Sequence, residues 1–120
     1  MSRERGLDLQ NALARYLRRW WPAAESAGPG RPGTDVLGTP GVVWESKTAT
    51  DFKRDFKPTA WVAQCRAHAM AGEIPVTVYW PKGIGEERTG FTLSILPTDY
   101  LVYLLTEAGY GIDIDSDETS

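Results

Sequence analysis

Three charged residues stand where two short apolar segments meet a Gly/Pro turn. Asp35 precedes the turn, and Glu45 and Lys47 end the apolar run that follows it. An unpaired buried charge is costly, so this run either ends at the surface or carries groups that a function needs. Because side chains of a strand alternate between its faces, Glu45 and Lys47 point the same way, about 6.6 Å apart along the chain. Folding at the turn brings Asp35 close to them.

Two carboxylates and one ammonium group at a strand end suit the hydrolysis of phosphate esters. Two carboxylates can hold Mg²⁺, which polarises a phosphate and lowers the pKa of a bound water. The lysine can orient the attacking water or stabilise the charge of the transition state. Spacing alone leaves a second interpretation open, a surface salt bridge worth about 0–1 kcal/mol.

Apolar periodicity and the Gly and Pro positions predict the elements that must hold these residues. They predict an α/β single domain with a mixed central sheet flanked by helices, in the order helix-strand-strand-helix-strand-strand-helix. Strands 34–38 and 41–47 are expected to form an antiparallel hairpin, and the crossover from 41 to 80 a parallel pair. The predicted segments are a helix at 7–21, a loop at 22–33, the two strands of the hairpin, a polar connector at 48–57, a helix at 58–72, a strand at 74–80, a turn at 81–90, a strand at 91–97 and a helix at 98–109.

The ends of the helices have their own signals. Pro22 is expected to end the first helix, and Gly72 the second. Thr98 or Asp99 is expected to cap the start of the last helix. Trp20 continues the apolar spacing of the first helix, but Trp20 and Trp21 cannot both face one core. One of the two is therefore expected at a dimer interface.

Composition narrows the classes of function. The chain has 120 residues, no apolar stretch long enough for a membrane span and no signal-peptide core at its start, which predicts a cytoplasmic protein. A single Cys and a single His exclude multi-cysteine zinc sites, so a metal would be bound by oxygen. Four acidic residues at 113–120 give a tail predicted to be disordered, after a domain at 1–112. Without these four acids the net charge changes from −3 to +1.

The stretch GTDVLGTPGVVWESKTA, residues 33–49, resembles the active-site signature of the PD-(D/E)XK nuclease superfamily. Asp35 stands at its first acidic position, Glu45 at the second and Lys47 at the lysine, while Thr34 replaces the proline of the name. Segments 3–20 and 61–83 are similar to the archaeal-type and phage-encoded Holliday junction resolvases of that superfamily. The resemblance covers about residues 3–105.

The resemblance implies a restriction-endonuclease-like fold and a metal-dependent endodeoxyribonuclease that hydrolyses phosphodiester bonds in branched DNA. The cofactor would be Mg²⁺, for which Mn²⁺ can substitute. Asp35 and Glu45 would hold the metal, Lys47 would orient the attacking water, and Gln64 would support that water. Gln10 stands where these resolvases carry a metal-binding glutamate. Glu4 and Asp8 are two other candidates for the missing acid.

The resemblance also implies partners. A four-way junction needs two cuts, which implies a C2 homodimer in the cytoplasm of a phage-infected host. Three alternatives stay open from the sequence. They are a nuclease for flaps, ends or single strands on the same fold, a non-catalytic DNA-binding module, and a protein-interaction domain that uses an exposed tryptophan and the acidic tail. The basic residues expected to contact DNA are Arg3, Arg5, Lys53, Arg54 and Lys57.

Overall fold

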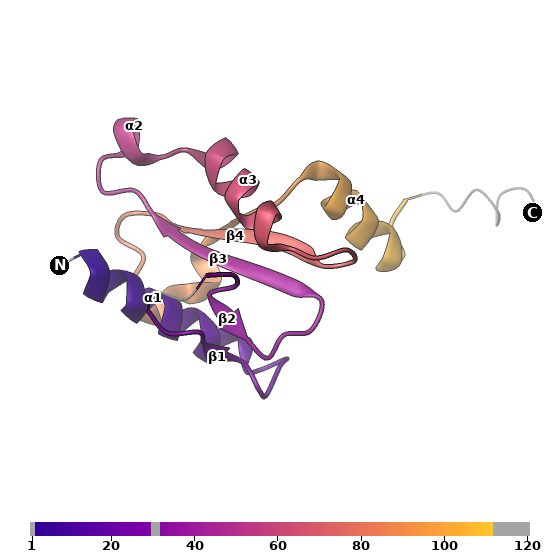
Figure 1. Ribbon diagram of the computed structural model, residues 1–120, viewed down its shortest axis with the longest axis horizontal. Helices are drawn as coiled ribbons and strands as arrows, with labels where there is room; N and C mark the ends of the chain where they lie inside the picture. The colour runs from indigo at the N-terminus through magenta and orange to yellow at the C-terminus, as the bar shows by residue number, and fades with distance from the viewer. Residues whose placement is uncertain (1, 30–31, 112–120) are drawn as a thin grey trace, which may run out of the picture.

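A three-stranded sheet of mixed direction forms the centre of the protein (Figure 1). The structure is a computed structural model that describes residues 2–29 and 32–111. β3 (Val42–Thr48) and β4 (Ile74–Trp80) are parallel and paired along their full length, and β5 (Leu93–Ile95) joins β4 in the antiparallel direction. β4 is therefore the central strand, and one edge of β3 faces away from the sheet.

Helix α1 (Ser2–Leu17) covers one face of this sheet. Its apolar residues recur at helical spacing, so they form one stripe that packs against the inward side chains of the strands. Trp44 of β3 also packs against this cluster, at its margin. The buried residues of the cluster are Leu9, Ala12, Leu13, Ala14, Leu17, Ala24, Val36, Val76, Val78 and Trp80.

Helix α3 (Pro58–His68) covers the opposite face, after the short helix α2 (Phe52–Asp55). α3 buries Trp61 and Cys65. Trp61 lies against Tyr79 of β4, with ring centroids 5.7 Å apart. α2 and α3 thus form the crossover between β3 and β4, which confirms the predicted parallel pair.

The predicted antiparallel hairpin of strands 34–38 and 41–47 is wrong. The first strand is only β2 (Val36–Leu37), and it pairs with β1 (Glu25–Ser26), a strand inside the predicted loop. Gly38 explains this partner, because a Cβ at that position would collide with the carbonyl oxygen of Ala23. The absence of a side chain lets β2 lie directly beside the segment that carries β1.

Two helix ends also differ from the predictions. α1 ends at Leu17 rather than at Pro22, so Trp20 falls in the following turn and is 57% exposed. Trp21 instead packs against Trp44, with ring centroids 6.1 Å apart. α3 ends at His68, because the next residue is extended, and Gly72 lies in a later turn rather than at the helix end.

The C-terminal part is less tightly packed. The second half of the predicted turn at 81–90 is instead a 3-10 helix, η1 (Glu86–Phe91), and the following strand is shorter than expected. α4 (Thr98–Glu107) begins after Pro97 and has no side-chain cap from Thr98 or Asp99, contrary to the prediction. None of the residues of α4 is buried.

The order of the main elements, with the short β1, α2 and η1 set aside, is the predicted one. The chain is an α/β domain with a mixed sheet flanked by helices. None of the helices that the structure describes is long and apolar enough to cross a membrane. The predicted acidic tail at 113–120 lies outside the described residues.

Candidate active site

The edge of β3 that faces away from β4 is hydrogen-bonded to the segment just before β2. The N–H of Trp44 donates to the hydroxyl of Thr34 (2.9 Å), and the N–H of Asp35 donates to the carbonyl of Trp44 (2.7 Å). The N–H of Ser46 donates to Oδ2 of Asp35 (2.7 Å). Exposed backbone groups of an edge strand need such partners. Asp35 is therefore held against β3 beside Glu45, although the regular hairpin does not form.

Glu45 is the buried member of the candidate site. Its side chain is on the α3 face of β3, only 7% of the residue is exposed, and its Oε1 has no hydrogen-bond partner among the described residues. Burial raises the pKa of Glu45 to about 7, and the nearby charge of Asp35 raises this pKa as well. Burial also raises the pKa of Asp35 above its ordinary value. A buried and a half-buried carboxyl group so close together disfavour double ionisation.

Lys47, on β3, and Gln64, on α3, lie beside this pair of carboxyl groups. The ammonium Nζ of Lys47 donates to Oε1 of Gln64 (3.0 Å). Gln64 reaches Lys47 because its neighbour Cys65 and the residue one turn earlier, Trp61, fix α3 on the sheet. The structure thus brings together two residues that lie 17 positions apart in the chain. A lysine held in this way has a defined direction at the end of β3.

Gln10 reaches the site from α1. Its amide nitrogen donates to the backbone carbonyl of Asp35 (2.8 Å), which is the partner that a half-buried glutamine on the packed face needs. Gln10 therefore positions Asp35, and only its amide oxygen is left for another ligand. Asp8 is exposed and lies about 200° around the helix from Gln10, so it does not join Gln10 at the site. The side chain of Glu4 lies outside the described residues.

Three of the predicted DNA-contacting residues lie near the carboxyl end of β3, Arg5 beside Thr48 and Lys53 and Lys57 on the segment that follows β3. Arg5 is exposed in the first turns of α1, and Lys53 and Lys57 are exposed on and just after α2. The side chain of Arg3 lies outside the described residues.

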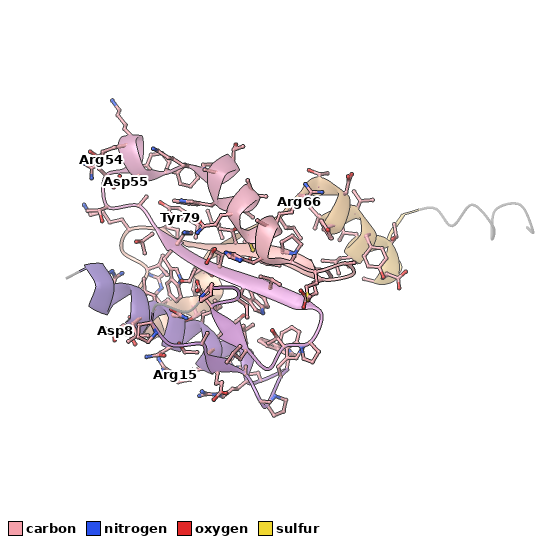
Figure 2. The ribbon with its side chains drawn as sticks, viewed as in Figure 1. Asp8, Arg15, Arg54, Asp55, Arg66 and Tyr79 are labelled. Carbon is pink, nitrogen blue, oxygen red and sulfur yellow. The ribbon has the colours of Figure 1, made fainter. Side chains whose placement is uncertain are left out.

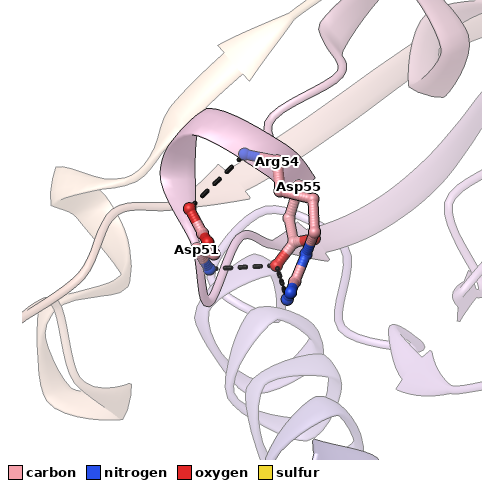
Figure 3. A network of polar contacts seen from close by, with 3 residues as sticks. All are labelled: Asp51, Arg54 and Asp55. Atoms are coloured by element: carbon pink, nitrogen blue, oxygen red, sulfur yellow. Dashed lines mark hydrogen bonds and ion pairs between the residues drawn. The ribbon is translucent and has the colours of Figure 1, made fainter.

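Arg54 was expected to contact DNA, but its side chain is paired with an acidic neighbour. Its guanidinium donates to both carboxylate oxygens of Asp55, at 2.8 and 3.1 Å (Figure 3). This pairing lowers the pKa of Asp55 to about 2. Asp51 caps the same short helix by accepting from the N–H of Arg54 (3.4 Å). The charge of Arg54 is therefore offset within α2.

Thr77 is a residue of the site that sequence reasoning missed. It is the register partner of Glu45 on β4, so the two side chains share the α3 face. It is 1% exposed, and its hydroxyl has no hydrogen-bond partner among the described residues. The signal in the sequence was a single polar residue inside the otherwise apolar run IPVTVYW. Glu45 and Thr77 are thus neighbours across two strands, and each has one buried polar atom without a hydrogen-bond partner, which is the kind of atom that a water or an ion can satisfy.

The oxygen donors are compatible with Mg²⁺. Within the part of the chain that the structure describes, no group of three or more His, Cys, Asp or Glu side chains is placed to hold a metal ion. Mg²⁺ nevertheless binds through one or two carboxylates, keeps several waters and takes further oxygens from the substrate phosphate. Asp35 and Glu45 meet that requirement, and the unpartnered Oε1 of Glu45 is an oxygen for which a cation is a suitable partner.

No family model matches this chain, and no curated protein and no solved structure matches it either. The resemblance to the PD-(D/E)XK nucleases therefore stays a prediction from the sequence.

Proposed function

We propose that this protein is a metal-dependent endodeoxyribonuclease of the PD-(D/E)XK type with a restriction-endonuclease-like fold. The observation that carries the proposal is the assembly at the edge of β3. Asp35 and Glu45 lie together there, and Lys47 follows them with Gln64 as its partner. Two neighbouring carboxylates followed by an oriented lysine match what hydrolysis of a phosphodiester requires.

Each residue has a role in this proposal. Asp35 and Glu45 hold Mg²⁺, which when bound supplies Lewis-acid polarisation of the phosphate. Lys47 orients the attacking water and stabilises the charge that develops on the phosphate oxygens. Gln64 fixes the direction of the Lys47 ammonium group. Gln10 keeps the backbone of Asp35 in place.

The proposed substrate is branched DNA, most specifically a four-way junction. This part rests on the resemblance of segments 3–20 and 61–83 to the Holliday junction resolvases. Contact would be through the sugar-phosphate backbone, because the basic residues Arg5, Lys53 and Lys57 are exposed around the end of β3. The proposed compartment is the cytoplasm.

We further propose that the active form is a homodimer joined through α4. Helices that are apolar on all sides are normally buried, yet all five residues of the α4 run LVYLL are 38–55% exposed in the single chain. They present on the order of several hundred Å² of apolar surface, which is the range that marks an interaction site. A second copy of this chain is the occupant that we propose, because two copies of α4 related by a twofold axis would cover each other's apolar side chains. A dimer would also supply the two cuts that a junction needs.

A cleavage assay tests the proposed function. Purified protein is incubated with a synthetic four-way junction, a flap and a linear duplex, each with Mg²⁺ or EDTA, with Lys47→Ala in parallel. Paired, symmetric cuts in the junction that disappear with EDTA and with Lys47→Ala are the expected result. Cuts in flaps or ends alone would support the nuclease assignment and contradict the resolvase assignment.

One observation favours a second candidate, a non-catalytic DNA-binding module. Oδ2 of Asp35 already accepts a hydrogen bond from the N–H of Ser46, and this bond serves the structure of the strand edge. In that case no substrate would be cut with Mg²⁺ or Mn²⁺. DNA binding would then be unchanged by the metal and by Lys47→Ala.

A further inference from the structure

A cavity of about 260 Å³ opens at the carboxyl ends of β3 and β4. It is lined by Thr48 and Trp80, which are the last residues of the two strands and partners in the register. Thr50 and Lys82 line it from the segments that follow the strands, and Arg5 lines it from α1. Three separate segments of the chain therefore converge on one hollow beside the candidate active site.

The charge of the cavity is positive. Arg5 and Lys82 are both exposed, and neither forms a salt bridge within the described residues. Among the side chains that the structure describes, no acidic one lines the cavity, and the hydroxyls of Thr48 and Thr50 add further donors. A guanidinium, an ammonium and hydroxyl groups without an opposing carboxylate form a suitable site for a phosphate oxygen.

The size and walls of the cavity favour a phosphate with its sugar over a base. Its volume is below the roughly 300 Å³ at which sites for drug-sized ligands begin. The aromatic residue in the lining, Trp80, is only 2% exposed, and its indole N–H donates to the hydroxyl of Ser46 (2.9 Å). A base entering the cavity would therefore find no aromatic face on which to stack.

We propose that this cavity binds a backbone phosphate of the DNA strand, next to the phosphate that is cut, through Arg5 and Lys82. The proposal rests on the proposed nuclease function. Thr48 directly follows Lys47, but their side chains point to opposite faces of β3. A strand that crosses the end of β3 meets Lys47 on the α3 face and the cavity on the α1 face. The cavity would hold the strand in register without reading its sequence.

Binding of a fluorescent four-way junction in EDTA, measured over a series of salt concentrations, tests this site separately from cleavage. We expect Lys82→Ala and Arg5→Ala each to weaken binding about five- to tenfold and to lower the slope of log K against log salt by about 1. Lys82→Arg should restore most of the affinity. Arg66→Ala is the matched control, because it removes one positive charge from an exposed residue beside α4 that does not line the cavity (Figure 2).

A second measurement locates the phosphate. Single uncharged methylphosphonate linkages are placed in turn around the cleavage site. One position next to the cut should weaken binding to the native protein, and the same linkage should cause no further loss in Lys82→Ala. If every linkage costs the native protein and Lys82→Ala the same, the phosphate is not held by Lys82 and the proposal is wrong.

The possible failures can be told apart. If the native protein cuts DNA but Lys82→Ala and Arg5→Ala bind as Arg66→Ala does, the cavity proposal is wrong and the nuclease proposal stands. If the native protein binds DNA through Lys82 but cuts no substrate with Mg²⁺ or Mn²⁺, the nuclease proposal is wrong and the cavity is a phosphate site of a binding module. If it binds no DNA at low salt, both proposals are wrong.

Discussion

At the scale of single residues, the central feature is a carboxyl group with an altered pKa next to an oriented lysine. Glu45 is almost fully buried, and its pKa is raised to about 7 by burial and by Asp35. Metal ligands must be deprotonated to bind, so Mg²⁺ binding would release a proton near neutral pH. Cys65 is also buried, and burial raises the pKa of its thiol to about 11.

Glu45 should make the metal-free protein less stable as the pH rises. A carboxyl whose pKa is higher in the folded state favours folding only while it is protonated. The free energy of unfolding in EDTA should therefore fall between pH 4.5, its ordinary pKa, and about pH 7. The expected loss is on the order of 3 kcal/mol. Urea unfolding at several pH values measures it.

Glu45→Gln should remove most of this fall, because glutamine does not titrate. Glu25→Gln, an exposed acid on β1, serves as the control and should retain it. An unchanged pH dependence in Glu45→Gln would show that Glu45 titrates normally.

Lys47 and Gln64 should contribute unequally to cleavage. Lys47→Ala removes a charge aimed at the transition state and should lower the single-turnover rate on the best substrate about 10²–10³-fold. Gln64→Ala removes only the group that orients Lys47 and should lower the rate about tenfold, with DNA affinity unchanged. Arg66→Ala, at an exposed position of the same helix, is the control and should cut at the native rate. Equal effects of the two substitutions would show that Gln64 contacts the reacting groups itself.

At the scale of elements, the outer edge of β3 decides where Asp35 stands. Thr34 accepts from the N–H of Trp44, and its hydroxyl also donates to the carbonyl of Val36 (2.9 Å). Side chains of Thr34 and Asp35 thus supply hydrogen bonds that a neighbouring strand would otherwise make. The proline that the superfamily signature names at this position would have no hydroxyl for these bonds.

Thr34→Val should therefore destabilise the protein by about 1–3 kcal/mol, because the N–H of Trp44 loses its partner. Thr34→Ser keeps the hydroxyl and should cost much less. Urea unfolding measures both variants, and equal losses would contradict a role for the hydroxyl.

At the scale of the whole molecule, the edge that carries the candidate site and the proposed dimer surface lie at different places. α1 and α3 enclose the sheet that carries the site, whereas α4 lies at the other end, beyond the carboxyl end of α3 (Figure 1). Association through α4 would leave both sites open to DNA.

Replacing two apolar residues of α4 should separate the dimer. Leu101→Lys with Leu105→Lys places charges on neighbouring turns of the exposed helix, and should give a folded monomer in light scattering coupled to gel filtration. Asn11→Lys, on the exposed face of α1, is the control and should stay a dimer. A native protein that is monomeric at all concentrations would contradict the dimer.

The sequence by itself determined the order of the main elements, the parallel pair of β3 and β4 and the core face of α1. These follow from local periodicity and from Pro and Gly positions, which act over short distances. The pattern also singled out Asp35, Glu45 and Lys47 as one group.

Only the tertiary structure decided how that group is held. The partner of β2 depends on close packing at Gly38, and the partner of Gln10 is a carbonyl 25 positions away. Thr77 belongs to the candidate site only because the register of β3 and β4 sets it beside Glu45. Burial also sets the pKa of Glu45, because desolvation depends on everything packed around the carboxyl and not on its neighbours in the chain.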